Sequence, residues 1–117
     1  MANLIDCMHL GNDRVIGAWE VRPGVIVDPG PASCAHTLLA GVESEPRALL
    51  LTHIHLDHAG AAGALARRFP ELQVYVHEVG APHEIDPSRL VASAERLYGD
   101  DMGRLWGEIV PVPADRI

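Results

Sequence analysis

Three histidines and one aspartate lie within a stretch of six residues: His53, His55, Asp57 and His58. Neutral imidazole nitrogens and carboxylate oxygens are the usual protein ligands of Zn²⁺ and similar metals. His53 and His55 are two positions apart, so in extended backbone both side chains point the same way and could bind one ion. Asp57 and His58 are adjacent and point differently, so they could hold a second ion beside the first. Two ions about 3.5–4 Å apart can lower the pKa of a bridging water and stabilise both reacting oxygens of a hydrolysis. The stretch therefore predicts a metal centre; the alternative is a solvated loop that is rich in histidine.

The elements around this stretch place it at the end of a strand. An apolar run at 48–51 predicts a buried strand, the motif forms a loop at 52–58, a helix covers 59–68, and a further strand covers 72–76. Strand, crossover helix and strand imply parallel pairing with a right-handed crossover. Ligands bind outside the carboxyl ends of such strands, which is where the motif falls. The residues alone thus indicate a metal site in an α/β protein.

The first third of the chain predicts an antiparallel meander of three strands, at 4–8, 15–21 and 25–27. Asp28 ends the third strand. It could turn the chain by bonding the backbone two residues on, or it could reach the histidine loop and orient a metal ligand from the second shell. A helix is expected to begin at 31–33, with Ser33 as its N-cap.

The last third predicts a loop at 80–83, a helix that opens at 86–88, a short helix at 103–107, and a strand at 109–113 that its prolines confine to a sheet edge. Leu90, Val91, Ala94 and Leu97 follow helical spacing. Two interpretations of the helical pair stay open. It could cap the site and shape a substrate pocket, or its leucines and Trp106 could be ordinary core.

The pattern His53-x-His55-x-Asp57-His58 behind an apolar strand resembles the metal motif of the metallo-β-lactamase-fold hydrolases. The earlier segment Val27-Asp28-Pro29-Gly30-Pro31 resembles that family's strand-end Asp-x-Gly motif. The resemblance implies an α/β (α+β) fold of the αββα sandwich type. This chain would supply about one half of it, as a mixed sheet with helices on one face.

The resembled hydrolases carry a further histidine ligand, a bridging aspartate and a last histidine in the second half of their fold. This sequence has no histidine after His83. The expectation is that 1–117 is one metallo-β-lactamase-like domain truncated to its N-terminal half. The alternative is a natural half-length protein that completes its site as a homodimer.

The resemblance also implies an activity. His53 and His55 would bind one Zn²⁺ and Asp57 and His58 a second, with Fe or Mn as other possible metals, and Asp57 would additionally be catalytic by steering water or a proton. A metal-bound hydroxide would attack an ester, thioester or lactone carbonyl of a small molecule. The branch resembled most is that of glyoxalase II, or hydroxyacylglutathione hydrolase. The alternative is a catalytically inactive fragment, or a metal-binding or interaction module that needs a second half or a dimer partner.

Composition narrows the class of protein. The 117 residues carry a formal charge of −7, which disfavours nucleic acid as a partner. No apolar run approaches the roughly 18–20 residues of a membrane span, and the start of the chain lacks the features of a signal peptide. Cys7 and Cys34 are too few for a disulfide framework and are expected to be buried thiols. We therefore expect a cytoplasmic protein without nucleic-acid or membrane partners.

Overall fold

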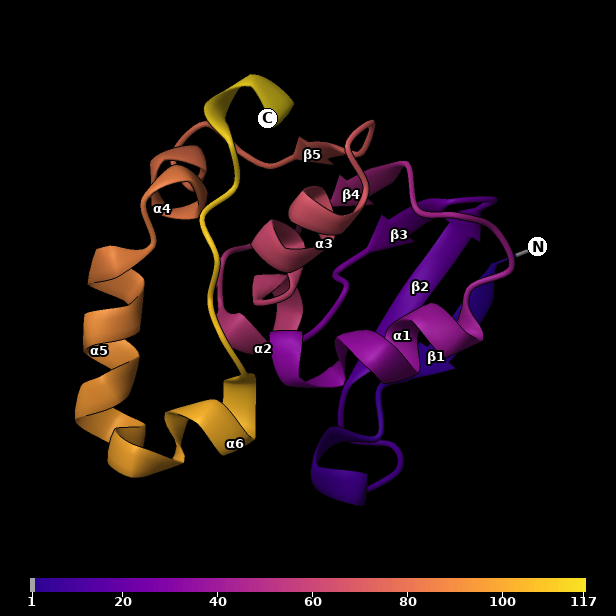
Figure 1. Ribbon diagram of the computed structural model, residues 1–117. Helices are drawn as coiled ribbons and strands as arrows, with labels where there is room; N and C mark the ends of the chain where they lie inside the picture. The colour runs from indigo at the N-terminus through magenta and orange to yellow at the C-terminus, as the bar shows by residue number, and fades with distance from the viewer. Residues whose placement is uncertain (1) are drawn as a thin grey trace.

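Five strands form one mixed sheet in the computed structural model, which describes residues 2–117 (Figure 1). The strands lie in chain order across the sheet: β1 (Asn3–Asp6), β2 (Gly17–Arg22), β3 (Val25–Val27), β4 (Ala48–Leu50) and β5 (Gln73–Tyr75). The first three pair antiparallel, and Gly24 closes the tight β2–β3 turn with a φ of +77°. β3, β4 and β5 pair parallel. The predicted meander and the predicted parallel pairing are both confirmed.

Helices cover one face of this sheet, as predicted (Figure 1). Between β3 and β5 the chain forms α1 (Ala35–Gly41), α2 (Leu56–Ala59) and α3 (Ala62–Arg68). After β5 it forms α4 (Ala81–Ile85), α5 (Ser88–Tyr98) and α6 (Met102–Trp106), and short 3₁₀ turns occur at His9–Gly11, Ala32–Cys34, Gly99–Asp101 and Ala114–Arg116. In Figure 1, α5 runs along the left side of the molecule, and the C-terminal segment passes between it and α3. Within residues 2–117, each helix is too short or too polar to cross a lipid bilayer.

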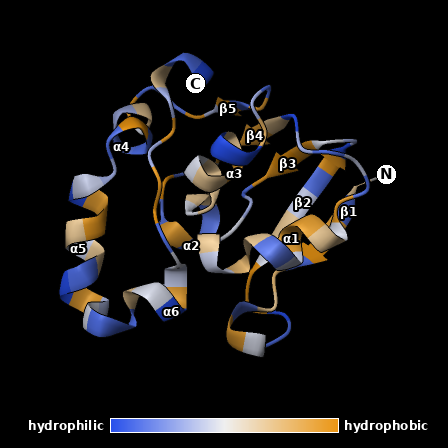
Figure 2. Ribbon diagram, viewed as in Figure 1, coloured by the Kyte–Doolittle hydropathy of each residue, from blue (hydrophilic) through white to orange (hydrophobic). Residues whose placement is uncertain are grey.

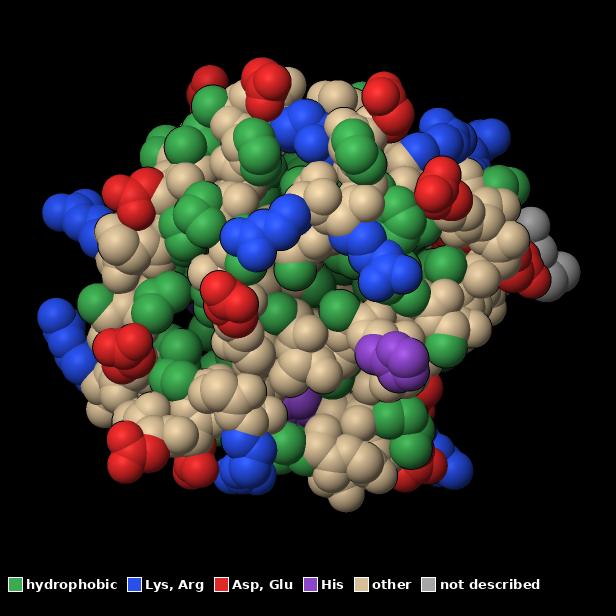
Figure 3. All heavy atoms as spheres, viewed as in Figure 1, with side chains coloured by type: hydrophobic (Ala, Val, Ile, Leu, Met, Phe, Trp, Pro, Cys, Tyr) green, Lys and Arg blue, Asp and Glu red, His purple; other side chains and the backbone are tan. Residues whose placement is uncertain are grey.

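The core lies between the sheet and the helices because side chains alternate across each strand. One residue from every strand is buried toward the helices: Ile5, Ala18, Ile26, Leu49 and Val74. They pack with Leu38 of α1 and Leu65 of α3, and Figure 2 shows the hydrophobic colouring of β3, β4 and β5. Both cysteines are buried and free, as expected. On the helix-covered face, Arg side chains (blue) stand over α3 among hydrophobic ones (Figure 3).

The opposite face of the sheet is open and apolar. The strand register places one row of side chains across all five strands: Leu4, Trp19, Val27, Leu50 and Tyr75. Leu4 is 56% exposed, Trp19 44% and Tyr75 57%. Because large apolar side chains in a continuous row are unusual on a free surface, this row marks a face suited to a partner layer.

Two predictions for the last third are wrong. Residues 109–113 form no strand; they cross α3 as extended coil, where Gly63 leaves room, since a Cβ at that position would lie 1.7 Å from the carbonyl oxygen of Val110. The N–H of Val112 donates to the carbonyl oxygen of Glu84 at 2.9 Å, and Val112 is buried. The loop expected at 80–83 is the start of α4, because proline is tolerated in the first turn of a helix, where Pro82 lies.

The N-cap prediction for Ser33 is also wrong. Ser33 lies inside the 3₁₀ turn that leads into α1, and its hydroxyl donates to the carbonyl oxygen of Leu105 at 2.8 Å. The Ser33 side chain makes no capping hydrogen bond, and the N-cap position of α1 is Cys34. Ser33 therefore joins α6 to the start of α1.

Candidate metal centre

The motif follows β4 at the carboxyl end of the parallel part of the sheet. The expected loop at 52–58 is correct only in its first half, because α2 begins at Leu56. The N–H groups of His58 and Ala59 donate to the carbonyl oxygen of His55 at 3.0 and 2.8 Å, which starts the helix inside the motif. Asp57 stands in the first turn, where the helix dipole favours a negative charge. The His-x-His pair is thus extended and the Asp-His pair is helical.

The segment after β3 is bonded to the same place. The N–H of Gly30 donates to the carbonyl oxygen of His58, and the N–H of Ala61 donates to that of Gly30, both at 2.9 Å. Gly30 adopts a φ of +87°, a conformation that glycine reaches without strain. These two bonds bring Asp28 against the motif although 24 positions separate it from Thr52.

The side chains of the motif form two overlapping donor groups. The donor atoms of His53, His55 and Asp57 lie within 4.8 Å of one another, and so do those of Asp28, His53 and His58. The two groups share His53. Asp57 is also near the second group, since its Oδ2 lies 3.3 Å from Nε2 of His58. All five residues that the sequence indicated are therefore brought together, and the pairing of particular residues with particular ions stays a prediction.

Asp28 holds the motif through three hydrogen bonds. Its Oδ1 accepts from the N–H of Thr52 at 2.8 Å, and its Oδ2 accepts from the hydroxyl of Thr52 at 2.7 Å. The same Oδ2 lies 3.0 Å from Nδ1 of His58. Asp28 is only 9% exposed and adopts a φ of 51°, in the left-handed region that aspartate visits more readily than most residues. From this position Asp28 can orient the ring of His58, the role that the sequence suggested for it.

These bonds fix the tautomers of two histidines. A carboxylate only accepts, so Nδ1 of His58 must carry the proton that it shares with Asp28. The single hydroxyl proton of Thr52 also goes to Asp28, so Nδ1 of His53, 2.8 Å from the Thr52 oxygen, must donate to that oxygen. In neutral rings this leaves the lone pair on Nε2 of both residues, and that of His58 faces the Asp57 carboxylate 3.3 Å away, so a cation between these two groups would be held by both. A free ring nitrogen beside a hydrogen-bonded one is the arrangement of metal-binding histidine.

The donor set fits a borderline metal such as Zn²⁺, because it consists of imidazole nitrogens and carboxylate oxygens. Among the residues that the structure describes, the other histidines lie outside the donor groups. His36 is exposed on α1, and Nδ1 of His77 accepts from the N–H of Val79 at 3.1 Å. The metal-ligand chemistry is therefore concentrated in the motif.

Sequence reasoning missed two polar residues near the site. One is Thr52, whose hydroxyl joins His53 to Asp28; a hydroxyl next to a histidine pair is the signal that could have found it. His9 is buried, stacks on Trp106 with ring centres 5.2 Å apart, and places its Nε2 2.6 Å from the carbonyl oxygen of Leu105. No local pattern predicts a contact across 96 positions.

Known proteins are similar to this chain in part of its sequence and in its fold. A hydroxyacylglutathione hydrolase of Hamiltonella defensa subsp. Acyrthosiphon pisum is 51% identical over 51 residues, which are 44% of this chain and 20% of the relative. One of Yersinia enterocolitica is 47% identical over 58 residues, 50% of this chain and 23% of the relative. The matched part of the chain thus spans about a fifth to a quarter of the length of these relatives.

The solved structure of an archaeal metallo-beta-lactamase superfamily protein from Sulfolobus tokodaii superimposes with a TM-score of 0.69 at 19% identity. The superposition covers 98% of this chain and 46% of the archaeal one, so it shows the fold. The model of the metallo-beta-lactamase superfamily matches residues 18–116. That range contains β2 from Ala18 onward, β3 to β5, the strand-end Asp28 and the whole histidine motif, and this chain is a member of the metallo-beta-lactamase superfamily.

Proposed function

We propose that this chain carries the metal-binding part of a zinc-dependent hydrolase that cleaves an ester, thioester or lactone. The observation that carries the proposal is the pair of donor groups that share His53, backed by the tautomers that Asp28 and Thr52 impose. The relatives named hydroxyacylglutathione hydrolase favour a thioester among these substrates. Their whole-protein activity extends to this chain only as a proposal, because the matched region is about a fifth to a quarter of their length.

In this proposal the residues of the site have separate roles. His53, His55, Asp57 and His58 hold the metal, and Asp28 orients His58 from behind. Bound zinc would supply Lewis acidity and lower the pKa of a water so that it can attack a carbonyl near neutral pH. The side chain of Asp57 is 44% exposed, so its carboxylate can meet solvent and orient the attacking water or accept its proton.

The test combines metal content with turnover. Elemental analysis of the purified chain should find about one or two zinc ions per molecule, since a two-metal site is proposed. His55→Ala and Asp57→Ala should lose zinc, whereas His36→Ala, which removes an exposed histidine of α1, should keep it. Thioesters of glutathione with hydroxyacyl groups, simple thioesters and lactones are then screened for hydrolysis.

The expected result is hydrolysis that falls in the two ligand variants by more than the roughly 10–100-fold that outer-shell changes cause. Zinc binding without hydrolysis of any substrate class would contradict the enzyme proposal. Equal zinc in wild type and ligand variants would contradict the proposed centre itself.

A second candidate is a metal-binding module without turnover, completed by a second copy of the chain. The open row of apolar side chains on the sheet favours it, because pairing two such faces would remove Leu4, Trp19 and Tyr75 from water. Light scattering should then give twice the chain mass, and Trp19→Arg combined with Tyr75→Arg should give a monomer that still binds zinc. A monomeric wild type would contradict this second candidate.

A further inference from the structure

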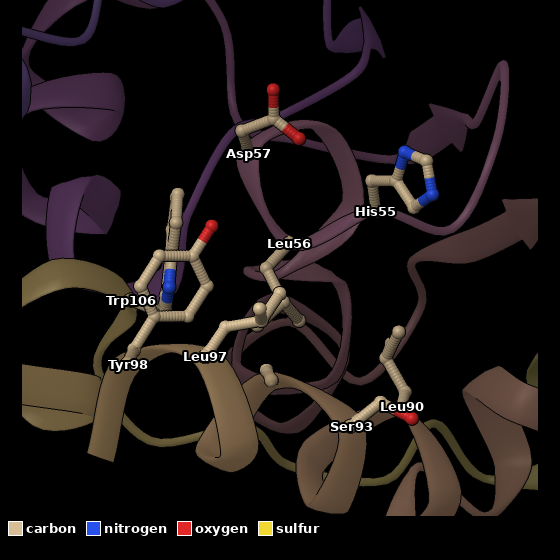
Figure 4. Close-up of a pocket in the computed structure, with 9 residues that line it drawn as sticks. His55, Leu56, Asp57, Leu90, Ser93, Leu97, Tyr98 and Trp106 are labelled. Atoms are coloured by element: carbon tan, nitrogen blue, oxygen red, sulfur yellow. The ribbon is translucent and has the colours of Figure 1, made fainter.

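A cavity of about 430 Å³ lies between α2 and the helical pair α5–α6. Its size falls within the roughly 300–1,000 Å³ of small-molecule sites. His55 and Asp57 of the metal motif line one side of it, and Figure 4 shows Leu90, Ser93 and Leu97 on the opposite side. The same two motif residues belong to a metal donor group. A molecule held in the cavity would therefore reach the candidate metal centre.

The side of the cavity away from the metal donors is apolar. Leu56 projects from α2 toward α5 (Figure 4), and Ala94 of α5, which also lines the cavity, is 8% exposed. Leu97 also lines the cavity, yet it is 80% exposed. A leucine on a helix next to a reactive site, without cover of its own, gains from an apolar ligand that removes it from water. Of the two interpretations of the helical pair, the substrate pocket is the one that this geometry favours.

The aromatic end of the cavity is held in place. The rings of Tyr98 and Trp106 meet edge to face, 5.4 Å apart. Trp106 is backed by the stacked ring of His9, which also bonds to the backbone of α6 at Leu105. The wall is therefore built from three separate segments of the chain, and it gives the cavity a firm end against which a chain of carbon atoms can pack.

The charge of the residues that line the cavity favours an uncharged ligand. Arginine is absent from the residues that line the cavity, and its anionic side chain is that of Asp57, a proposed metal ligand. An anionic ligand would find no counter-charge there, whereas an uncharged hydrocarbon chain would need none. The name of the relatives describes a thioester of glutathione. Glutathione, the thiol part of such a substrate, carries carboxylates, so the uncharged acyl part suits this cavity better.

We propose that this cavity, next to His55 and Asp57 and walled by α5 and α6, binds the uncharged acyl chain of the substrate. The inference rests on the proposed hydrolase function. Substrates with longer unbranched acyl chains are preferred until the cavity is full. Each buried methylene is worth roughly a fourfold gain in binding, so the preference is measurable as a slope of kcat/KM against chain length.

The first experiment measures binding without turnover. The chain has two tryptophans, so Trp19→Phe leaves Trp106 as the reporter of the cavity. Its fluorescence is titrated with N-hexylacetamide, a neutral ligand with no ester bond. We expect saturable binding that weakens at least tenfold in Ala94→Leu, which fills the cavity, and in Leu97→Ser, which disturbs the fold little because this side chain is exposed. Ala92→Leu, an exposed position on the same helix, is the matched control and should stay within twofold.

The second experiment measures hydrolysis of acetyl, butyryl and hexanoyl thioesters of one thiol. The wild type and the exposed control Ala92→Leu should show the chain-length slope, and Ala94→Leu should lose it. Binding that depends on Ala94 without any hydrolysis would leave the cavity proposal standing and overturn the hydrolase proposal. Hydrolysis whose kcat/KM does not depend on acyl chain length would overturn the cavity proposal. So would an affinity for N-hexylacetamide that Ala94→Leu and Leu97→Ser leave unchanged.

Discussion

Replacing Asp28 with asparagine isolates the role of one buried carboxylate. Asn has the same shape and tolerates the left-handed conformation that Asp28 adopts, at a φ of 51°, so the backbone should keep its path. The variant changes the hydrogen bonding and removes one negative charge, without changing the shape of the side chain. Oδ1 still accepts from the N–H of Thr52, which turns the amide nitrogen toward the hydroxyl of Thr52 and Nδ1 of His58.

The expected effect follows from the proton on His58. An amide N–H that faces Nδ1 needs an acceptor there, so the imidazole proton moves to Nε2. Zinc binding through Nε2 must then return the proton to Nδ1 and give up a hydrogen bond, and bonds to charged groups contribute about 1.5–3 kcal/mol. This matches the roughly 10–100-fold loss of metal affinity, about 1.4–2.8 kcal/mol, that outer-shell changes cause.

Two measurements check the prediction for Asp28→Asn. Competition with a chromophoric chelator gives the zinc affinity, and heteronuclear NMR of the imidazole nitrogens gives the tautomer of His58 in the metal-free protein. Asp13→Asn, an exposed aspartate paired with Arg14, is the control and should behave as wild type. Zinc affinity within twofold of wild type, with the proton still on Nδ1 of His58, would refute the reasoning.

Three further predictions concern stability and are measured by chemical unfolding. Gly63→Ala should lower the free energy of unfolding by about 1–3 kcal/mol, because its Cβ meets the backbone of Val110. Gly103→Ala, in α6 with open space around the new methyl group, should raise it by about 0.5–1 kcal/mol; equal effects of the two substitutions would contradict this account of helix packing. Glu20→Gln should cost about 2 kcal/mol, because the buried carboxylate accepts from four N–H donors and an amide cannot. Burial raises the pKa of Glu20, and the hydrogen bonds from these donors lower it. The hydrogen bonds have the larger effect together, so the pKa lies below the ordinary 4.5. The carboxylate's contribution is therefore complete above pH 4.5 and is lost as the pH falls through the lower folded pKa, and a Glu20→Gln variant with the acid sensitivity of wild type would disprove its role.

Local pattern was sufficient for the sheet and for finding the donor residues that the fold brings together. Val25-Ile26-Val27 is a short apolar run between a Pro-Gly turn and Asp28, and the structure gives β3 those bounds. The histidine motif could be located because ligand-type residues at close spacing behind a buried strand carry their chemistry in the sequence itself.

The failures come from tertiary contacts that no local pattern contains. Val110 and Val112 alternate as in a strand, but they pack on α3, where Gly63 admits the backbone. Ser33 has the chemistry of an N-cap but bonds Leu105, 72 positions away. The cavity beside the metal centre likewise joins α2 to α5 and α6, so only the folded chain shows that Leu90 and Leu97 face the motif.

X-ray absorption spectroscopy of the zinc-loaded chain tests the central claim most directly. The account predicts nitrogen and oxygen neighbours at about 2.0–2.1 Å, with the outer scattering of imidazole rings, and no sulfur neighbour at about 2.3 Å. Both free thiols, Cys7 and Cys34, lie outside the donor groups, so sulfur would show that zinc binds elsewhere. A sulfur shell, or a spectrum that His55→Ala and Asp57→Ala leave unchanged, would contradict the metal centre described above.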